Sequence, residues 1–330
     1  MTPPAAAGNS FQAFFDAVDK FFSSLAAVHW GSLALGLLAF FVYLTFRARA
    51  SYNILRAAYP ETRIGFREIW AAYWAGYGFN NVIPARGGDV IRLFLTKTSV
   101  PGSSYSAVAA AFAVEAVYDA TMAVVVLSFA FTQGVFPKPP DFSQLNAFDL
   151  SYFAAHPQFA LFTIAALAIG AIALTALLSA RVKAFWARVR QGLTILFDRR
   201  RYIREVWLVQ FCGWLFRFTA FWFLLDAFNI GGSLRNVMLV LGVQAVAAVV
   251  PFTPGGAGVV QALLVKVFAD QASPDTVAAY SVGQQVAIAA FSFGIGFGGL
   301  ATVFRIRSFK EVIRRGREDR AADKAAAAAV

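Results

Sequence analysis

Long apolar stretches dominate this chain and constrain its fold more than any other feature. Five of them are long enough to cross a bilayer as a helix, at 1.5 Å of rise per residue. They lie at about residues 28–46, 104–131, 157–179, 206–228 and 277–304. Only 14% of the chain is charged, against about 25% in a typical soluble domain. The sequence therefore predicts an all-α polytopic membrane protein.

Basic residues gather in a few segments that flank the apolar stretches. Arg47 and Arg49 follow the first stretch, further Lys and Arg fill 181–204, and a basic tail occupies 305–330. Lys and Arg are enriched in the cytoplasmic loops of membrane proteins. We therefore expect a multi-pass membrane protein with its N-terminus outside and its C-terminal tail in the cytoplasm. This pattern accounts for the net charge of +11, so no nucleic-acid partner is expected.

Residues 1–27 precede the first apolar stretch and differ from it in pattern. Apolar residues recur there at helical spacing, at Phe11, Phe14, Phe15, Val18, Phe21, Phe22 and Leu25. This spacing predicts an amphipathic helix on the membrane surface. The charge pattern makes the segment extracytoplasmic.

A first broken segment, at about 68–99, interrupts the apolar pattern. Within it, the stretch 80–92 contains a proline, a glycine pair and three charged residues. Irregular backbone is tolerated at membrane depth only where protein buries it or where it lines a polar cavity. The second arm is too short and too charged for a full span. We predict a re-entrant hairpin entered from the cytoplasm, with two ordinary spans as the alternative.

A second broken segment, at about 234–268, contains a Pro/Gly-rich turn at 251–258. The charge pattern predicts that this hairpin is entered from outside. Each half of the chain then has the order span, hairpin, span, with one connecting span between the copies. Inverted repeats with discontinuous helices are common in secondary transporters. The sequence thus predicts an inverted-repeat helical bundle with two re-entrant hairpins.

Arg86 and Arg92 flank the turn of the first hairpin. Free N–H groups at the start of a helix arm and the forked donors of arginine both suit an anion such as a lipid phosphate. The two arginines are therefore candidates for binding a lipid headgroup. The alternative is that they only anchor the hairpin at the cytoplasmic headgroups.

Glu115 and Asp119 lie four residues apart in an apolar stretch, hence on one helical face. Two explanations stay open. A buried pair of acids raises the pKa of one member and suits proton coupling. Alternatively, the acids form static ion pairs with Arg217, which lies near the middle of its own stretch. Gln261 follows the second turn and joins the candidate polar network.

Motifs of common enzyme classes are missing from the sequence, which contains no P-loop and no Ser/His/Asp arrangement. His29 and His156 flank different spans, and Cys212 is the only cysteine. We therefore expect no metal site, no cofactor and no catalytic residue. The sequence favours a transporter over an enzyme without excluding a membrane transferase.

Both broken segments carry motifs of one known family. Its Asn-x-x-x-Pro-x-Arg-x-Gly-(Glu/Asp)-x-x-Arg motif is matched by Asn80, Pro84, Arg86, Gly88, Asp89 and Arg92. Its later Pro-x-x-Pro-Gly-Gly-x-Gly motif is matched by Pro251, Pro254, Gly255, Gly256 and Gly258. Its Glu-Arg-x-x-Asp motif is kept as Glu115 and Asp119. The chain resembles the flippase-like family that shares the transmembrane region of lysylphosphatidylglycerol synthases.

The resemblance implies a protein of the bacterial inner membrane that translocates or handles an anionic or isoprenoid-linked lipid for envelope biogenesis, with both broken motifs at the headgroup. Membrane lipids and envelope-lipid biosynthesis enzymes are the implied partners. Ala116 replaces the usual arginine between the acids, and Gln261 replaces a common glutamate. We expect a stand-alone member without a lysyl-transferase domain, hence no aminoacyl transfer. The alternatives are a transferase acting on a lipid carrier and a scaffold of a lipid or glycolipid, for example hopanoid, biosynthetic complex.

Overall fold

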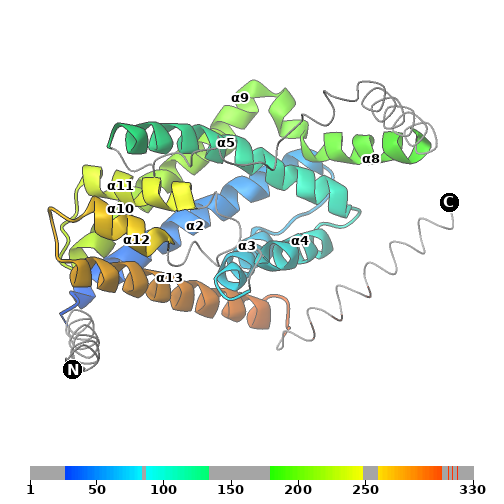
Figure 1. The fold of residues 1–330 in the computed structure, drawn as a ribbon. Coiled ribbons are helices and arrows are strands. Elements are labelled where there is room, and N and C mark those ends of the chain that lie inside the picture. The colour runs from blue at the N-terminus through cyan, green and yellow to red at the C-terminus, as the bar shows by residue number, and fades with distance from the viewer. Residues whose placement is uncertain are drawn as a thin grey trace, which may run out of the picture.

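The computed structural model describes residues 27–83, 87–133, 179–247 and 259–306, together with three positions in the tail. These residues form helices and no strand (Figure 1). In the described part of the chain, four helices are long and apolar enough to cross a membrane. They are α2 (Trp30–Ala58), α5 (Tyr105–Thr132), α13 (Pro274–Thr302) and the run Arg199–Ala227, which α9, η4 and α10 form together. The predicted all-α membrane class is confirmed.

The remaining helices are shorter. They are α3 (Phe66–Asn80), α4 (Gly87–Ser99), α8 (Ser179–Gly192), η3 (Thr194–Phe197), α11 (Leu234–Ala247) and α12 (Val259–Val267). Within the long run, α9 covers Arg199–Tyr202, the π-helical turn η4 covers Ile203–Trp207, and α10 covers Leu208–Ala227. The 15 residues of α3 span about 22 Å, less than the ~30 Å apolar core of a bilayer. Short helices thus stand where the sequence predicts broken segments.

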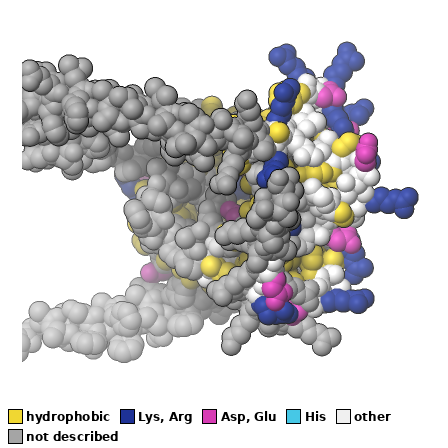
Figure 2. All heavy atoms as spheres, turned by 90° about the vertical axis from the view of Figure 1, so that its right-hand side faces the viewer, with side chains coloured by type: hydrophobic (Ala, Val, Ile, Leu, Met, Phe, Trp, Pro, Cys, Tyr) yellow, Lys and Arg dark blue, Asp and Glu magenta, His cyan; other side chains and the backbone are white. Residues whose placement is uncertain are grey.

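Helices α2 and α10 lie antiparallel at the centre of the bundle. At one end, the His29 N–H donates to the carbonyl oxygen of Ala227 at 2.9 Å. At the other, the Asn53 side-chain amide donates to the carbonyl oxygen of Glu205 at 2.7 Å. The second of these ends carries exposed arginines, and Figure 2 shows Lys and Arg gathered there. We call it the basic end; its arginines include Arg56, Arg63, Arg67, Arg199, Arg200 and Arg204.

The two pairs of short helices open at different ends of the bundle (Figure 1). Helices α3 and α4 pack against each other between the end of α2 and the start of α5, so this first hairpin opens at the basic end. Helices α11 and α12 pack against each other between the end of α10 and the start of α13. Because α10 is antiparallel to α2, this second hairpin opens at the opposite end.

Helix contacts repeat in matched pairs. Helix α3 packs on α13 as α11 packs on α5, and α2 contacts α3 as α10 contacts α11. Helix α4 likewise contacts α5 as α12 contacts α13. If α2, α3, α4 and α5 are matched with α10, α11, α12 and α13 in that order, each of these contacts in one set has its counterpart in the other. Two structural repeats related by a twofold axis produce this pattern. How the hairpins enter a membrane stays a prediction.

Glycines let α3 approach α13 closely. A Cβ atom at Gly78 would lie 2.6 Å from the carbonyl oxygen of Ser292, and one at Gly296 would lie 2.6 Å from that of Trp74. Small residues at helix interfaces are the usual means of close packing in membranes. This interface fixes the first hairpin against the last span.

The first span differs from its predicted form. The charge pattern placed Arg47 in a cytoplasmic loop after residue 46, but α2 continues to Ala58 and Arg47 is buried within it. The placement of Arg47 was therefore wrong. Several other predictions lie outside the described residues. They concern most of the N-terminal segment 1–27, the span 157–179, the turn 251–258 and most of the tail 305–330.

Candidate functional site

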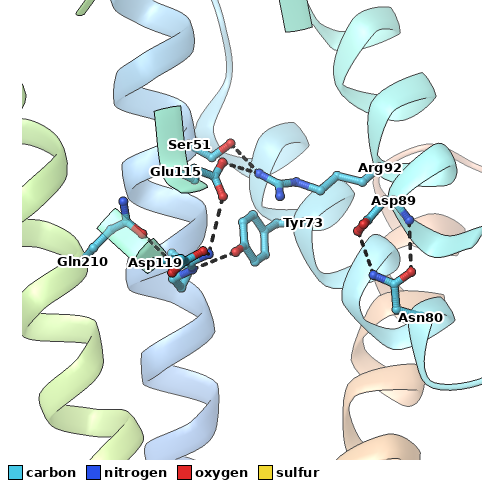
Figure 3. A network of polar contacts seen from close by, with 9 residues as sticks. Ser51, Tyr73, Asn80, Asp89, Arg92, Glu115, Asp119 and Gln210 are labelled. Carbon is cyan, nitrogen blue, oxygen red and sulfur yellow. Dashed lines mark hydrogen bonds and ion pairs between the residues drawn. The ribbon is translucent and has the colours of Figure 1, made fainter. Parts of the chain in front are cut away.

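Two glycines and an asparagine shape the first hairpin. A Cβ atom at Gly88 would lie 2.1 Å from the carbonyl oxygen of Gly76, so only glycine fits where α4 crosses α3. The Asn80 side-chain amide donates to Asp89 Oδ1 at 2.7 Å, and the Asp89 N–H donates to Asn80 Oδ1 at 3.1 Å. This reciprocal pair joins the last residue of α3 to the first turn of α4 (Figure 3).

Arg92 projects from α4 into the bundle (Figure 3). Its Nη2 donates to Ser51 Oγ at 2.9 Å and forms an ion pair with Glu115. Its guanidinium lies between two rings, 4.0 Å from the centroid of Tyr73 and 3.9 Å from that of Phe112. Among the described residues, the Nε and Nη1 donors of Arg92 make no hydrogen bond.

Arg47, in contrast, uses all three of its guanidinium nitrogens. Nη1 and Nη2 donate to the two carboxylate oxygens of Asp119 at 2.5 and 2.8 Å. Nε donates to the Tyr73 hydroxyl at 2.9 Å, and Nη1 also donates to Gln210 Oε1. Arg47 therefore ties together α2, α3, α5 and α10.

The network is balanced in charge. Glu115 lies within ion-pair distance of both arginines, at 3.8 Å from Arg47 Nη2, while Asp119 pairs with Arg47. Two cations thus meet two acids, and Glu115 is only 5% exposed. Buried charges persist when they are paired and hydrogen-bonded. Glu115 and Asp119 do share one helical face, and their partners are Arg47 and Arg92.

Arg217 does not pair with these acids. Its guanidinium lies over the rings of Trp214, Tyr43 and Phe221, at 4.6, 5.6 and 5.9 Å from their centroids. The static pairing of the acids with Arg217, one of the two sequence-based explanations, is therefore wrong. In the described residues, the two acids instead form ion pairs with Arg47 and Arg92.

A polar cavity of about 240 Å³ lies beside this network. A single water needs only ~15 Å³ of such space, so the cavity admits a larger polar group. Most of its wall comes from α2, α3 and α4. The lining residues are Tyr43, Leu44, Arg47, Tyr73, Tyr77, Asn80, Asn81, Asp89 and Arg92. Polar side chains outnumber apolar ones, in a bundle whose other interior positions are mainly apolar.

A comparison with protein families matches residues 10–298 to the family described as the lysylphosphatidylglycerol synthase TM region. The match covers most of the chain. This chain belongs to that family. Membership of the lysylphosphatidylglycerol synthase TM region family identifies a membrane protein related to lipid handling. A comparison with curated proteins finds no match.

The cavity brings together three of the residues that the family motif singled out: Asn80, Asp89 and Arg92. Gly88 supports them from the crossing of α3 and α4. Gln261 is half-buried in α12 and does not line the cavity. The other motif positions lie outside the described residues: Pro84, Arg86, Pro251, Pro254, Gly255, Gly256 and Gly258.

Sequence reasoning missed several residues of the site. Arg47 was hidden because it stands next to other arginines at the apparent end of an apolar stretch. Tyr73 and Tyr77 look like ordinary membrane aromatics, although their spacing of four residues places them on one face of α3. Within the described part of the chain, no group of His, Cys, Asp and Glu is suited to hold a metal ion.

Proposed function

We propose that this member of the lysylphosphatidylglycerol synthase TM region family moves the polar headgroup of an anionic or isoprenoid-linked lipid across a bacterial inner membrane. The observation that carries the proposal is the polar cavity at the tip of the first hairpin, inside an apolar bundle. Such a cavity shelters a headgroup while the lipid tails stay in the bilayer. The family's relation to lipid handling supports the same conclusion.

The two arginines take different roles in this proposal. Arg92 holds Glu115 through one nitrogen and keeps Nε and Nη1 for the phosphate of a headgroup. Arginine binds phosphate through two parallel hydrogen bonds. Arg47 has no spare nitrogen and keeps the surrounding helices in place. Asn80 and Asn81 add polar groups to the cavity wall.

The charge distribution supports an orientation. Exposed arginines surround the basic end, whereas acids outnumber cations among the described charges near the opposite end, which are Asp226, Arg235, Lys266, Asp270 and Asp275. By the positive-inside tendency, the basic end faces the cytoplasm. The N-terminus then lies outside, the tail lies inside, and the two hairpins enter from different sides. The two repeats alternate access around the cavity.

Lipid translocation in vesicles tests the proposal. The purified protein is placed in phosphatidylcholine vesicles that contain phosphatidylglycerol labelled with a dithionite-sensitive fluorophore, and dithionite then reports the label that reaches the outer leaflet. Arg92→Lys keeps a cation beside Glu115 but removes the forked donors. We expect it to slow translocation about tenfold, the effect of losing one charge-assisted hydrogen bond.

Arg235→Lys is the matched control, because Arg235 is exposed at the opposite end and donates only to Gln133 among the described residues. It should leave the rate unchanged. Equal rates in Arg92→Lys and wild-type protein would contradict the site. Formation of a new lipid product from an added donor would favour the transferase. Loss of envelope lipids on deletion, with full rescue by hairpin variants, would favour the scaffold.

A further inference from the structure

Arg217 stands apart from the other two arginines of the bundle interior described above. It occupies the middle of α10, and its contacts among the described residues are with aromatic faces. Its side chain is half-buried, and among the described residues its buried Nε has no hydrogen-bond acceptor. Arg47 and Arg92 each have a carboxylate, but in the described part of the chain Arg217 has none.

An arginine in this position is costly to keep. Charged side chains inside a membrane are rare, and they mark pathways for ions and substrates. Cation–π contacts with Trp214, Tyr43 and Phe221 offset part of the cost. They satisfy none of the five N–H donors with a hydrogen-bond acceptor. The guanidinium is therefore prepared for an anion that the described residues do not supply.

Tyr43 connects Arg217 to the cavity. Its ring lies beneath the Arg217 guanidinium, and the same side chain lines the cavity. Ser51, Arg47 and Tyr43 are spaced four residues apart and form one face of α2, with a rise of about 6 Å between neighbours. Ser51 contacts Arg92, and Tyr43 contacts Arg217. Along α2, three arginines therefore lie at successive levels: Arg92 beside Ser51, Arg47 itself, and Arg217 beside Tyr43.

This order has a direction. Residue numbers on α2 fall from the basic end toward the opposite end, so Arg217 lies farther from the basic end than the Arg47 level. Glu115 neutralises the charge of Arg92, and Asp119 neutralises that of Arg47. Among the described residues, Arg217 contacts only aromatic rings. Of the three arginines, the one farthest from the basic end, Arg217, is thus the one whose charge stays available to bind an anion.

We propose that Arg217 forms a second anion-binding subsite beyond Tyr43, which receives the phosphodiester of a lipid headgroup as it leaves the cavity toward the opposite end. This subsite rests on the proposed function. Movement of the Tyr43 ring opens the passage between cavity and subsite. The forked donors of Arg217 then bind two phosphate oxygens, and an unpaired cation suits an anionic headgroup better than a neutral one.

The translocation assay in vesicles tests this subsite with three variants. Arg217→Gln removes the charge and should slow the movement of labelled phosphatidylglycerol about tenfold or more. Arg217→Lys keeps a cation over the rings without the fork, and its rate should fall between the two. Thr219→Val is the control, because Thr219 is exposed on α10 and, among the described residues, donates only to the carbonyl oxygen of Leu215. Wild-type rates in Arg217→Gln would overturn the subsite.

Fluorescence of Trp214 provides a second readout that translocation does not affect. The Trp214 ring lies against the Arg217 guanidinium, so an anion at Arg217 should change its emission. The probes are dihexanoylphosphatidylglycerol, dihexanoylglycerol without phosphate, and inorganic phosphate, added to the protein in detergent. The Trp214 contribution is the part of the response that Trp214→Phe removes.

We expect a response to dihexanoylphosphatidylglycerol, none to dihexanoylglycerol, and loss of the response in Arg217→Gln. A response to inorganic phosphate as strong as that to the phospholipid would overturn the claim that the anion bound at Arg217 belongs to a lipid. No response to either phosphate compound would overturn the subsite. If wild-type protein translocates nothing while this response is present, the proposed function fails and the anion-binding group stands.

Discussion

The two hairpins occupy equivalent places in the bundle but differ in chemistry. The first packs on α13 and the second on α5, and each connects two long helices. In the first, Asn80, Asp89 and Arg92 surround a polar cavity. The described arm α12 of the second, VVQALLVKV, is apolar apart from Gln261 and Lys266.

Among the described residues, the two halves of the repeated scaffold therefore differ in side-chain chemistry. The matched helix contacts serve packing in both halves, while the buried arginine–carboxylate network belongs to α2, α3, α4, α5 and α10. A site on one repeat is compatible with movement of the other repeat around it. The predictions that follow compare changes in the first hairpin and its network with changes elsewhere in the bundle.

Arg47→Leu should have the largest effect on stability. It leaves Asp119 without its forked partner and removes hydrogen bonds to Tyr73 and Gln210. Breaking a buried ion pair costs about 3–5 kcal/mol, and because the Asp119 side chain is 44% exposed the loss should lie at the lower end of this range. We expect a fall of this size in the free energy of unfolding, measured by denaturation in mixed detergent. Arg235→Leu should change it little, and equal losses in both variants would refute the structural role of Arg47.

Gly88→Ala should have the next largest effect. The new Cβ would meet the Gly76 carbonyl oxygen at 2.1 Å, so α3 and α4 must separate, at a cost of about 1–3 kcal/mol. Gly298→Ala is the matched control, because a Cβ there meets nothing within 4 Å. Thermal denaturation in detergent should show a loss for the first and none for the second. A tolerated Gly88→Ala would mean that the hairpin is more loosely packed than the structure shows.

Asn80→Ala and Asn236→Ala each remove one hydrogen-bonded asparagine, the first from the first hairpin and the second from the second hairpin. Asn80 makes two hydrogen bonds with Asp89, and Asn236 of α11 donates from its side chain to the Gly231 carbonyl oxygen at 3.0 Å. Each variant should lose about 1 kcal/mol of stability. Only Asn80→Ala should also slow translocation of labelled phosphatidylglycerol. Equal slowing by both variants would show that the second hairpin contributes to the site.

The sequence predicted the elements of this bundle better than their partners. Broken segments were visible because proline, paired glycines and charges interrupt apolar stretches, and the motif placed Asn80, Asp89 and Arg92 together. The partner of Asp119 was not visible. Arg47 is 72 positions away in sequence, and a local charge pattern cannot distinguish it from a loop arginine. Arg217 looked equally suitable, because spacing along one helix says nothing about which neighbour faces it.

Photo-cross-linking tests the central claim most directly. Phosphatidylglycerol with a photoreactive group on its headgroup is incorporated with the protein into vesicles, and the cross-linked peptides are identified by mass spectrometry. The account predicts labelling of α3 and α4 around Tyr77, Asn80 and Asn81, which unlabelled phosphatidylglycerol competes away and Arg92→Lys weakens. Labelling confined to α11 and α12, or spread over lipid-facing surfaces without competition, would contradict a headgroup site in the first hairpin.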